Sequence, residues 1–336
     1  MAETLIVVPD DFPSIFKGSP AEERCARLGE TRVYTERGAD GEAELIRRLD
    51  GARVAINIRA HARFTDAVFA ACPQLKLVSI WGTGTDNIDL QSAQRRRITV
   101  CNTAGVNANA VAEHAIALLL AVARRIPKID REMRSGAWPR EMLTQLLGKT
   151  LGVFGTGAIG MRVITLGKAL GMKVLAWSAR GETSRVVAAG ASVASKDEIL
   201  LDADVISLHL RLSPETRGFL GARELAMMKQ PAILINTGRG ALVDTAALIA
   251  ALKSGRLGGL AIDVYEEEEH LFFEDHSSEL LQDDLFARLQ TFPNVVITGH
   301  QAFFTEEALT AICRTTMANL SSFESGAGIP GDARVT

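Results

Sequence analysis

Two apolar runs near the middle of this 336-residue chain are joined by a glycine-rich turn and an amphipathic segment. The first run, Leu151 to Phe154, leads directly into Gly155-Thr156-Gly157-Ala158-Ile159-Gly160. The amphipathic segment ends near Gly171, and the second run, Met172 to Trp177, follows it. This order predicts a strand, a tight turn, a helix and another strand, which is the context in which the pattern G-x-G-x-x-G binds a dinucleotide.

Each glycine of this turn has its own physical role. Gly155 allows the sharp bend after the strand, and Gly160 lets the helix and the strand pack closely. Gly157 lets backbone amides approach a pyrophosphate at the helix N-terminus, where the helix dipole favours an anion. The alternative is a glycine-rich turn that binds nothing, but the flanking strands favour the cofactor. We therefore expect the whole turn to contact it: Gly155, Thr156, Gly157, Ala158, Ile159 and Gly160.

The bulk composition argues against several classes of protein. With a net charge of -3 and 23% charged residues, the chain shows no basic footprint for nucleic acid. The longest apolar run, Ala115 to Ala123, is too short to span a bilayer. The first residues lack a signal-peptide pattern, and the four cysteines show no metal-binding spacing. We therefore expect a cytoplasmic protein with reduced thiols, no metal site, and no nucleic-acid or membrane partner.

Short apolar runs alternate with helical patterns along nearly the whole chain, and buried parallel strands have this appearance in a sequence. The first block contains four such runs: Leu5 to Val8, Val54 to Ile58, Leu75 to Ile80 and Ile98 to Val100. The second block contains six: Leu151 to Phe154, Val174 to Trp177, Val205 to Leu208, Ile233 to Asn236, Gly259 to Ile262 and Val295 to Thr298. The pattern predicts an α/β protein with two doubly wound parallel-sheet domains.

The order of the elements also predicts how the two domains divide the chain. A long helix from about Asn109 to Ile126 leads into the second block, and a final helix, about Thr305 to Ser325, follows its last strand. That final helix could return to pack on the first block. We therefore expect a Rossmann dinucleotide-binding domain over 102–300, inserted in a flavodoxin-like substrate-binding domain formed by 1–101 and 301–336.

Three polar residues follow predicted strands of the second block, at the edge where doubly wound sheets bind ligands. They are Arg239, Glu268 and His300. A guanidinium can hold the carboxylate of a 2-oxo acid through two donors. A histidine can give a proton to the carbonyl oxygen as hydride reaches the carbon, and a neighbouring carboxylate would orient the ring and favour its protonated form. The set therefore predicts reduction of a small 2-oxo acid, with the hydride supplied by the cofactor.

Each of these residues also has a simpler interpretation. Arg239 could be a surface arginine after a glycine turn, Glu268 is one of four consecutive glutamates, and His300 is one of six histidines. His114 lies on an apolar helical pattern, so we expect it to be a core or helix-packing residue. His209 ends a strand beside the glycine turn, where it would contact only the cofactor.

Four motifs together resemble the D-isomer-specific 2-hydroxyacid dehydrogenases over nearly the whole chain. They are the glycine turn, Asn236-Thr237-Gly238-Arg239-Gly240-Ala241-Leu242-Val243-Asp244, Ala261-Ile262-Asp263-Val264-Tyr265-Glu266 and Gly299-His300-Gln301. The resemblance implies that Arg239, Glu268 and His300 are the catalytic residues. It implies that Asp263 contacts the nicotinamide amide and that Trp81-Gly82-Thr83-Gly84 grips the substrate carboxylate through its backbone. We also expect Thr237 and Gly238, in the arginine motif, to contact the cofactor.

The last third of the chain looks like fermentative D-lactate dehydrogenases, which implies that Phe303 forms an aromatic wall against a small substrate side chain. The first half departs from that pattern, because Val106 stands where lactate enzymes usually place a tyrosine. We expect pyruvate reduction to D-lactate, with glyoxylate and hydroxypyruvate as alternatives, and the homodimer that is usual in the family. The rival class is a nucleotide-sensing regulatory protein on the same fold. The presence of Arg239, Glu268 and His300 together argues against it.

The residues after Trp177 bear on the choice between NAD(H) and NADP(H). An acidic residue there would bind the ribose 2′-hydroxyl and repel a 2′-phosphate, but the chain reads Ser178-Ala179-Arg180. Ser178 and Arg180 could bind a 2′-phosphate, with Arg185 in reserve. The alternative is a polar loop in which Glu182 turns toward the ribose. We favour NADP(H).

Overall fold

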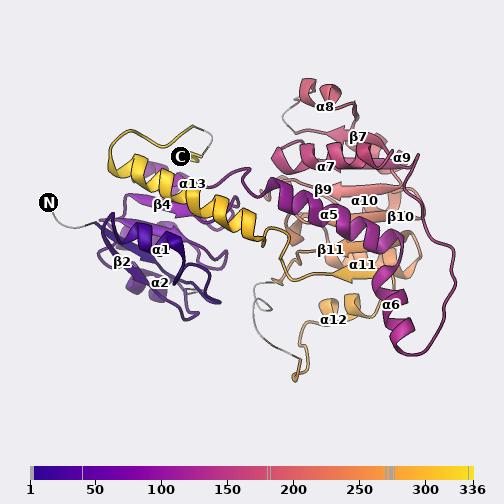
Figure 1. The fold of residues 1–336 in the computed structure, drawn as a ribbon, viewed down its shortest axis with the longest axis horizontal. Helices are drawn as coiled ribbons and strands as arrows, with labels where there is room; N and C mark the ends of the chain where they lie inside the picture. The colour runs from indigo at the N-terminus through magenta and orange to yellow at the C-terminus, as the bar shows by residue number, and fades with distance from the viewer. Residues whose placement is uncertain are drawn as a thin grey trace. The chain divides into compact units, whose positions relative to one another are not determined.

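The computed structural model describes residues 4–336, apart from positions 40, 180, 182, 269, 270, 272–274, 276 and 332. The chain divides into two compact units (Figure 1). Unit 1 comprises Met1–Asn107 and Thr305–Thr336, and unit 2 comprises Ala108–Phe304. Unit 2 is therefore an insertion in the chain of unit 1, and its limits lie a few residues later than the boundaries expected from sequence.

Unit 1 is built on a five-stranded sheet with the order β2-β1-β3-β4-β5, in which every pair is parallel. This order is the flavodoxin-like doubly wound arrangement. The central strands β3 and β4 are buried at every position, whereas the edge strand β2 is partly exposed. The strands are β1 (Leu5–Val8), β2 (Glu30–Val33), β3 (Val54–Asn57), β4 (Leu77–Ile80) and β5 (Thr99–Cys101).

Polar caps begin most helices of unit 1. Side chains of Ser19, Thr65, Asp89 and Thr305 accept hydrogen bonds from first-turn amides of α1, α3, α4 and α13, which satisfies donors that a helix leaves unpaired. The last helix, α13, packs against α1 and β4, so the C-terminal segment completes unit 1. The helices are α1 (Pro20–Cys25), α2 (Glu42–Arg48), α3 (Asp66–Ala71), α4 (Leu90–Arg95) and α13 (Glu306–Glu324).

Unit 2 contains a seven-stranded sheet with the order β12-β11-β10-β9-β6-β7-β8, and all its pairs are parallel. The strand order reverses between β6 and β9, which makes the carboxyl ends of these strands the expected ligand position of a Rossmann sheet. The strands are β6 (Thr150–Phe154), β7 (Lys173–Trp177), β8 (Ser192–Val193), β9 (Val205–Leu208), β10 (Ala232–Asn236), β11 (Leu257–Ile262) and β12 (Val295–Ile297). The predicted class, two parallel-sheet α/β domains with a Rossmann sheet, is confirmed.

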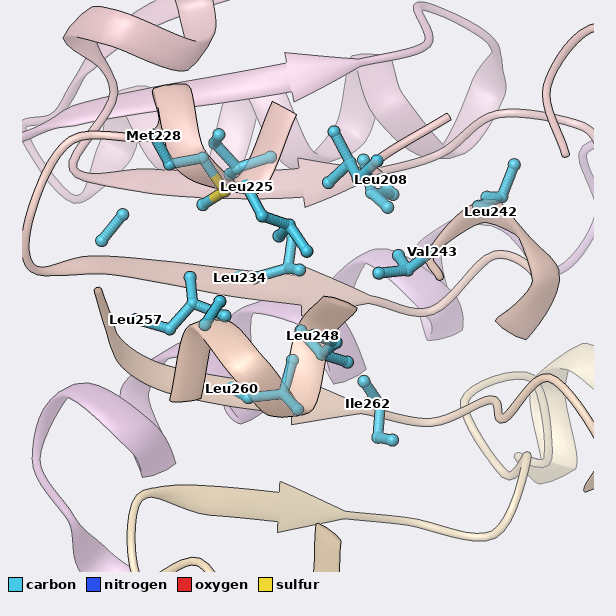
Figure 2. Packing of buried hydrophobic residues seen from close by; sticks show 14 of the residues in the cluster. Leu208, Leu225, Met228, Leu234, Leu242, Val243, Leu248, Leu257, Leu260 and Ile262 are labelled. Carbon is cyan, nitrogen blue, oxygen red and sulfur yellow. The ribbon is translucent and has the colours of Figure 1, made fainter. Parts of the chain in front are cut away.

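Helices cover both faces of this sheet, and two hydrophobic clusters lie beneath them. Successive residues of β10 alternate between the clusters, since Leu234 belongs to one and Ile233 and Ile235 to the other. Figure 2 shows the first cluster, where leucines of β9, β10 and β11 meet Leu225 and Leu248. The helices of unit 2 are α5 (Ala108–Ala123), α6 (Ile126–Arg134), α7 (Ala158–Ala169), α8 (Ser184–Ala188), α9 (Lys196–Asp202), α10 (Ala222–Met227), α11 (Thr245–Lys253) and α12 (Asp284–Gln290).

The long helix predicted from Asn109 to Ile126 is shorter than expected. It ends at Ala123, and a separate helix, α6, begins at Ile126. Arg125 between them has a left-handed backbone with φ of 49°, and Pro127 cannot donate the amide that a continuous helix would need. Within the described part of the chain, no helix is long and apolar enough to cross a membrane.

Candidate active site

The glycine turn lies where strand β6 meets helix α7, at the point of sheet reversal. Gly155 has φ of 101°, and a Cβ there would lie 2.4 Å from the His209 carbonyl oxygen, so only glycine fits. Gly157 is the N-cap of α7 without a side-chain cap, and a Cβ there would meet nothing within 4 Å. The chain therefore leaves open space in front of the first-turn amides, and this suits a pyrophosphate. The remaining predicted contacts lie beside this space: Thr156 in the turn, and Ala158, Ile159 and Gly160 in the first turn of α7.

Two buried polar atoms beside this turn have no hydrogen-bond partner. They are Nδ1 of His209, which follows β9, and Oγ1 of Thr237, which follows β10. The other ring nitrogen of His209, Nε2, forms a hydrogen bond with the Ser207 hydroxyl at 2.8 Å. Burial lowers the pKa of His209 to about 4, so its ring is neutral. Buried polar groups are nearly always paired, so these two atoms fit a polar ligand such as the expected dinucleotide.

The strand after the glycine turn carries the residues expected to distinguish NADP(H) from NAD(H). Ser178 follows β7 directly and is half-buried. Its carbonyl accepts a hydrogen bond from the Gly181 amide. The other proposed 2′-phosphate ligand, Arg180, and the alternative acid, Glu182, lie outside the described residues.

Arg239 lies on a turn that Asn236 shapes from the end of β10. Asn236 accepts a hydrogen bond from the Gly238 amide at 3.0 Å and donates one to the Arg239 carbonyl at 2.9 Å. The next residue, Gly240, is held against another loop, because a Cβ there would lie 2.0 Å from the Tyr265 carbonyl carbon. This close approach brings the turn carrying Arg239 next to the segment that leads to Glu268.

Glu268 and His300 form a hydrogen-bonded pair. Oε1 of Glu268 lies 3.0 Å from His300 Nδ1, and Oε2 accepts a hydrogen bond from the Tyr265 amide at 2.9 Å. Because the amide holds one carboxylate oxygen, the other is directed at the histidine. The resemblance indicated Glu268 among the four consecutive glutamates, and the structure pairs this residue with His300.

The backbone of His300 is in the left-handed region, with φ of 52°. This conformation costs a non-glycine residue about 1–2 kcal/mol, and the neighbouring residue Asp263 provides the contacts that hold it. The Asp263 carbonyl accepts from the His300 amide, and its carboxylate accepts from the amides of Gln301 and Ala302, all at 2.7–2.9 Å. Asp263 therefore fixes three consecutive amides of the turn that presents the histidine.

Asp263 is only 1% exposed, so its negative charge needs compensation. Burial alone would raise the pKa of this carboxyl, but His114 nearby, with Nε2 at 3.5 Å, and hydrogen bonds from Thr298 and the two amides outweigh it and lower the pKa below its ordinary value. The resemblance implied a contact between this aspartate and the nicotinamide amide, and the structure places its carboxylate against the His300 turn. Phe303 lies on the same turn, with its ring edge-on to His300 at 6.3 Å between centroids.

The residues predicted to grip the substrate carboxylate lie in unit 1, in the loop after β4. Trp81 is buried against Phe16. The Gly82 carbonyl accepts hydrogen bonds from the amide and hydroxyl of Thr103, and the Thr83 carbonyl accepts one from Asn102. Thr83 is exposed. These contacts fix the carbonyls of the loop, whereas the amides of Gly82 and Thr83 have no backbone partner among the described residues.

Sequence reasoning missed the residues that support the site rather than form it. Gly240 and Thr298 carry no signal of their own, because each acts through a contact with a distant part of the chain. The Tyr265 amide also carries none, because any residue has an amide and only the local turn directs this one at Glu268. His114 was expected to be a packing residue, and the structure gives it a hydrogen bond to Thr298. Among the described residues, no group of three or more histidine, cysteine or acidic side chains could hold a metal ion.

A glycine turn at the reversal point of a Rossmann sheet, with a carboxylate-paired histidine at the same edge, defines a dinucleotide-dependent oxidoreductase. Residues 116–302 match the family model described as D-isomer specific 2-hydroxyacid dehydrogenase, NAD binding domain. The chain is also 39% identical over 260 residues to a D-lactate dehydrogenase of Escherichia coli, covering 77% of this chain and 79% of that protein. This chain belongs to the D-isomer-specific 2-hydroxyacid dehydrogenase family, which confirms the resemblance seen in its motifs.

Solved structures agree with this assignment along almost the whole chain. A D-lactate dehydrogenase from Aquifex aeolicus, complexed with NAD and lactic acid, superposes with a TM-score of 0.85 at 29% identity and covers 96% of each chain. An acyclic imino acid reductase in complex with NADPH and D-Arg superposes with a TM-score of 0.86 at 27% identity, covering 99% of this chain and 100% of that one. Similar folds have thus been solved with either cofactor.

Proposed function

We propose that this protein reduces a small 2-oxo acid to the D-2-hydroxy acid, with pyruvate as its main substrate. The observation that carries the proposal is the Glu268–His300 pair, with 3.0 Å between Oε1 and Nδ1. A carboxylate that accepts from Nδ1 stabilises the imidazolium, which can then give a proton from Nε2. That is the chemistry required when a carbonyl oxygen becomes a hydroxyl.

The proposed role of each residue follows from the charge on the substrate group that it contacts. Arg239 binds the substrate carboxylate and polarises the carbonyl, because a guanidinium offers a planar fork of donors. The amides of Gly82 and Thr83 also donate to that carboxylate, and Trp81 supports their loop. His300 gives its proton to the carbonyl oxygen, and Glu268 orients the ring and balances its charge. When bound, the nicotinamide supplies the hydride to the carbonyl carbon.

The substrate is proposed from the residues around the reacting group. Phe303, edge-on to His300, would limit the side chain to a size near that of a methyl group, and this favours pyruvate. Val106 is small and half-buried, so glyoxylate and hydroxypyruvate are the alternatives. No observation favours the other candidate class, a nucleotide-sensing regulatory protein without turnover.

We propose NADPH as the preferred cofactor, held by the turn Gly155 to Gly160, His209, Thr237, Gly238 and Asp263. The preference is supported by the residue after β7, which is the half-buried Ser178 rather than an acid. A serine at this position can donate to a 2′-phosphate, whereas an acid would repel it. Arg180 and Arg185 are the proposed cations of this site. Initial rates with NADPH and NADH at equal concentration test the preference, and faster turnover with NADH would remove it.

We further propose a cytoplasmic homodimer formed through the nucleotide-binding unit. Unit 2 exposes several large apolar side chains in and after α6, and Trp138 and Met142 are 84% and 95% exposed. Large apolar side chains exposed to this degree, when they gather in one surface, are uncommon on a monomer and typical of an interface. All four cysteines are free thiols, which favours a reducing compartment.

The function is tested by following nicotinamide oxidation with pyruvate, glyoxylate, hydroxypyruvate and bulkier 2-oxo acids. We expect the highest kcat/KM with pyruvate and a D-configured product. Arg239→Ala should lower kcat/KM by orders of magnitude, because it removes both the carboxylate grip and the polarising charge. Absence of oxidation with every 2-oxo acid, or an L-configured product, would contradict the proposal.

A further inference from the structure

A second histidine lies behind the proposed proton donor. His114 is on α5, and its Nε2 is 3.0 Å from the Thr298 hydroxyl and 3.5 Å from Asp263 Oδ1. Its side chain is 25% exposed. The helix around it is anchored by buried Val111, Ala115 and Leu118. The imidazole is thus held on a rigid element beside the turn that carries His300.

The chemistry of the three groups fixes the direction of this hydrogen-bond chain. A carboxylate can only accept, so the Thr298 hydroxyl donates its single proton to Asp263 Oδ1, at 2.5 Å. The hydroxyl oxygen can then only accept from His114. Nε2 of His114 must therefore carry a hydrogen, and the chain runs from His114 through Thr298 to Asp263.

The end of this chain is the group that organises the His300 turn. Asp263 accepts from the amides of residues 300, 301 and 302 through its carbonyl and both carboxylate oxygens. Thr298 is also tied to the sheet by its amide, which donates to the Ile262 carbonyl. Movement of the Asp263 carboxylate would therefore release the amides of Gln301 and Ala302, which directly follow His300 in its turn.

We propose that His114 is a positioning residue for proton donation: by donating to Thr298, it holds the Asp263 carboxylate in the orientation that presents His300 beside Glu268. This inference rests on the proposed function for its catalytic consequence, but its structural part concerns the protein without ligands. It requires an N–H donor at the Nε2 position and does not require a charge. A leucine there would fill similar space without the donor, whereas a glutamine can present an amide N–H at nearly the same place.

The test compares His114→Leu and His114→Gln, with Glu113→Leu as a matched control on an exposed position of the same helix. The first readout is amide hydrogen exchange of residues 300–302 in the ligand-free protein. We expect faster exchange in His114→Leu and rates near wild type in His114→Gln and in the control. The second readout is steady-state reduction of pyruvate, where we expect kcat to fall roughly ten- to hundredfold in His114→Leu, with KM for the nicotinamide cofactor nearly unchanged and kcat largely restored in His114→Gln.

A double variant separates this chain of contacts from general packing. If His114 acts through Thr298, adding His114→Leu to Thr298→Val should cause little further loss of kcat or exchange protection. Unchanged exchange at residues 300–302 in His114→Leu, equal defects in the leucine and glutamine variants, or additive losses in the double variant would each overturn the inference. If the wild-type protein reduced no 2-oxo acid, the proposed function would fail, while the exchange measurement would still decide the role of His114.

Discussion

Replacing Glu268 by glutamine should remove general acid catalysis while leaving the shape of the site intact. In the native protein the Tyr265 amide donates to Oε2, and Oε1 faces His300 Nδ1. A glutamine must point either its oxygen or its NH2 group at the Tyr265 amide. Pointing the NH2 there leaves a donor facing a donor, which costs about 1–3 kcal/mol. The preferred arrangement therefore directs the NH2 group at His300.

The consequence for His300 follows from its tautomer. Nδ1 must accept from the glutamine NH2, so the ring carries its proton on Nε2 and is neutral. Giving up that proton would leave an imidazolate, and protonating Nδ1 would place two donors against each other. The imidazolium that donates in the native protein is therefore disfavoured, both by this cost and by the loss of the carboxylate charge beside it, and much of the contribution of general acid catalysis, about 10²–10⁴ in rate, should be lost.

The assay is steady-state pyruvate reduction with saturating cofactor, beside thermal unfolding of each variant. We expect kcat to fall by roughly 10²–10⁴ in Glu268→Gln, with KM for pyruvate changed little, because the substitution leaves the proposed contact between Arg239 and the carboxylate unchanged. Glu267→Gln, the same change on the exposed neighbour, should retain wild-type rates. A Glu268→Gln enzyme within a few-fold of wild type would refute the tautomer reasoning.

Three further predictions concern a close contact beside the site, the buried His209 and the proposed dimer interface. Gly240→Ala would place a Cβ 2.0 Å from the Tyr265 carbonyl carbon, so the melting temperature and the activity should both fall clearly. The control is Gly221→Ala, whose Cβ would meet only ordinary contacts, and its melting temperature should hardly change. Equal effects of the two substitutions would contradict this prediction. Burial lowers the pKa of His209 from 6.5 to about 4, so between pH 6.5 and pH 4 this histidine is protonated in the unfolded chain but not in the folded protein. The free energy of unfolding of the ligand-free protein should therefore decrease as the pH falls from 6.5 to 4, by up to about 3 kcal/mol. His209→Gln should show a shallower pH dependence in denaturant titrations, and an unchanged slope would count against it. Sedimentation should show a wild-type dimer and a shift toward monomer in Trp138→Asp; a monomeric wild type would remove the proposed interface.

The fold was largely predictable because its central strands are buried on both faces and appear in the sequence as apolar runs. The strands that escaped prediction are edges: β2 contains Glu30 and Arg32, and β8 is a pair of exposed residues, Ser192 and Val193. Each forms a strand because it pairs with the outer strand of its sheet, and the local sequence pattern does not indicate this pairing. The long predicted helix was wrong at its end, where a left-handed Arg125 and the following proline begin a new helix.

The candidate site was predictable where a chemically suitable side chain follows a strand of the sheet. Arg239 and His300 follow strands of one sheet, and polar side chains at strand ends are typical of ligand sites. Glu268 could be chosen from its glutamate run only by resemblance, because the feature that distinguishes it is the Tyr265 amide. The contact between His114 and Thr298 joins residues 184 positions apart. Such support depends on tertiary packing, which periodicity and spacing do not encode.

The central claim is that His300, backed by Glu268, protonates the carbonyl oxygen as the nicotinamide hydride reaches the carbon. Single-turnover reduction of pyruvate by His300→Asn, followed by nicotinamide absorbance, tests it most directly, because asparagine tolerates the left-handed backbone at this position. We predict that the rate of hydride transfer falls by roughly 10²–10⁴, while the Kd for the cofactor stays near its wild-type value. A rate within a few-fold of wild type would contradict the claim.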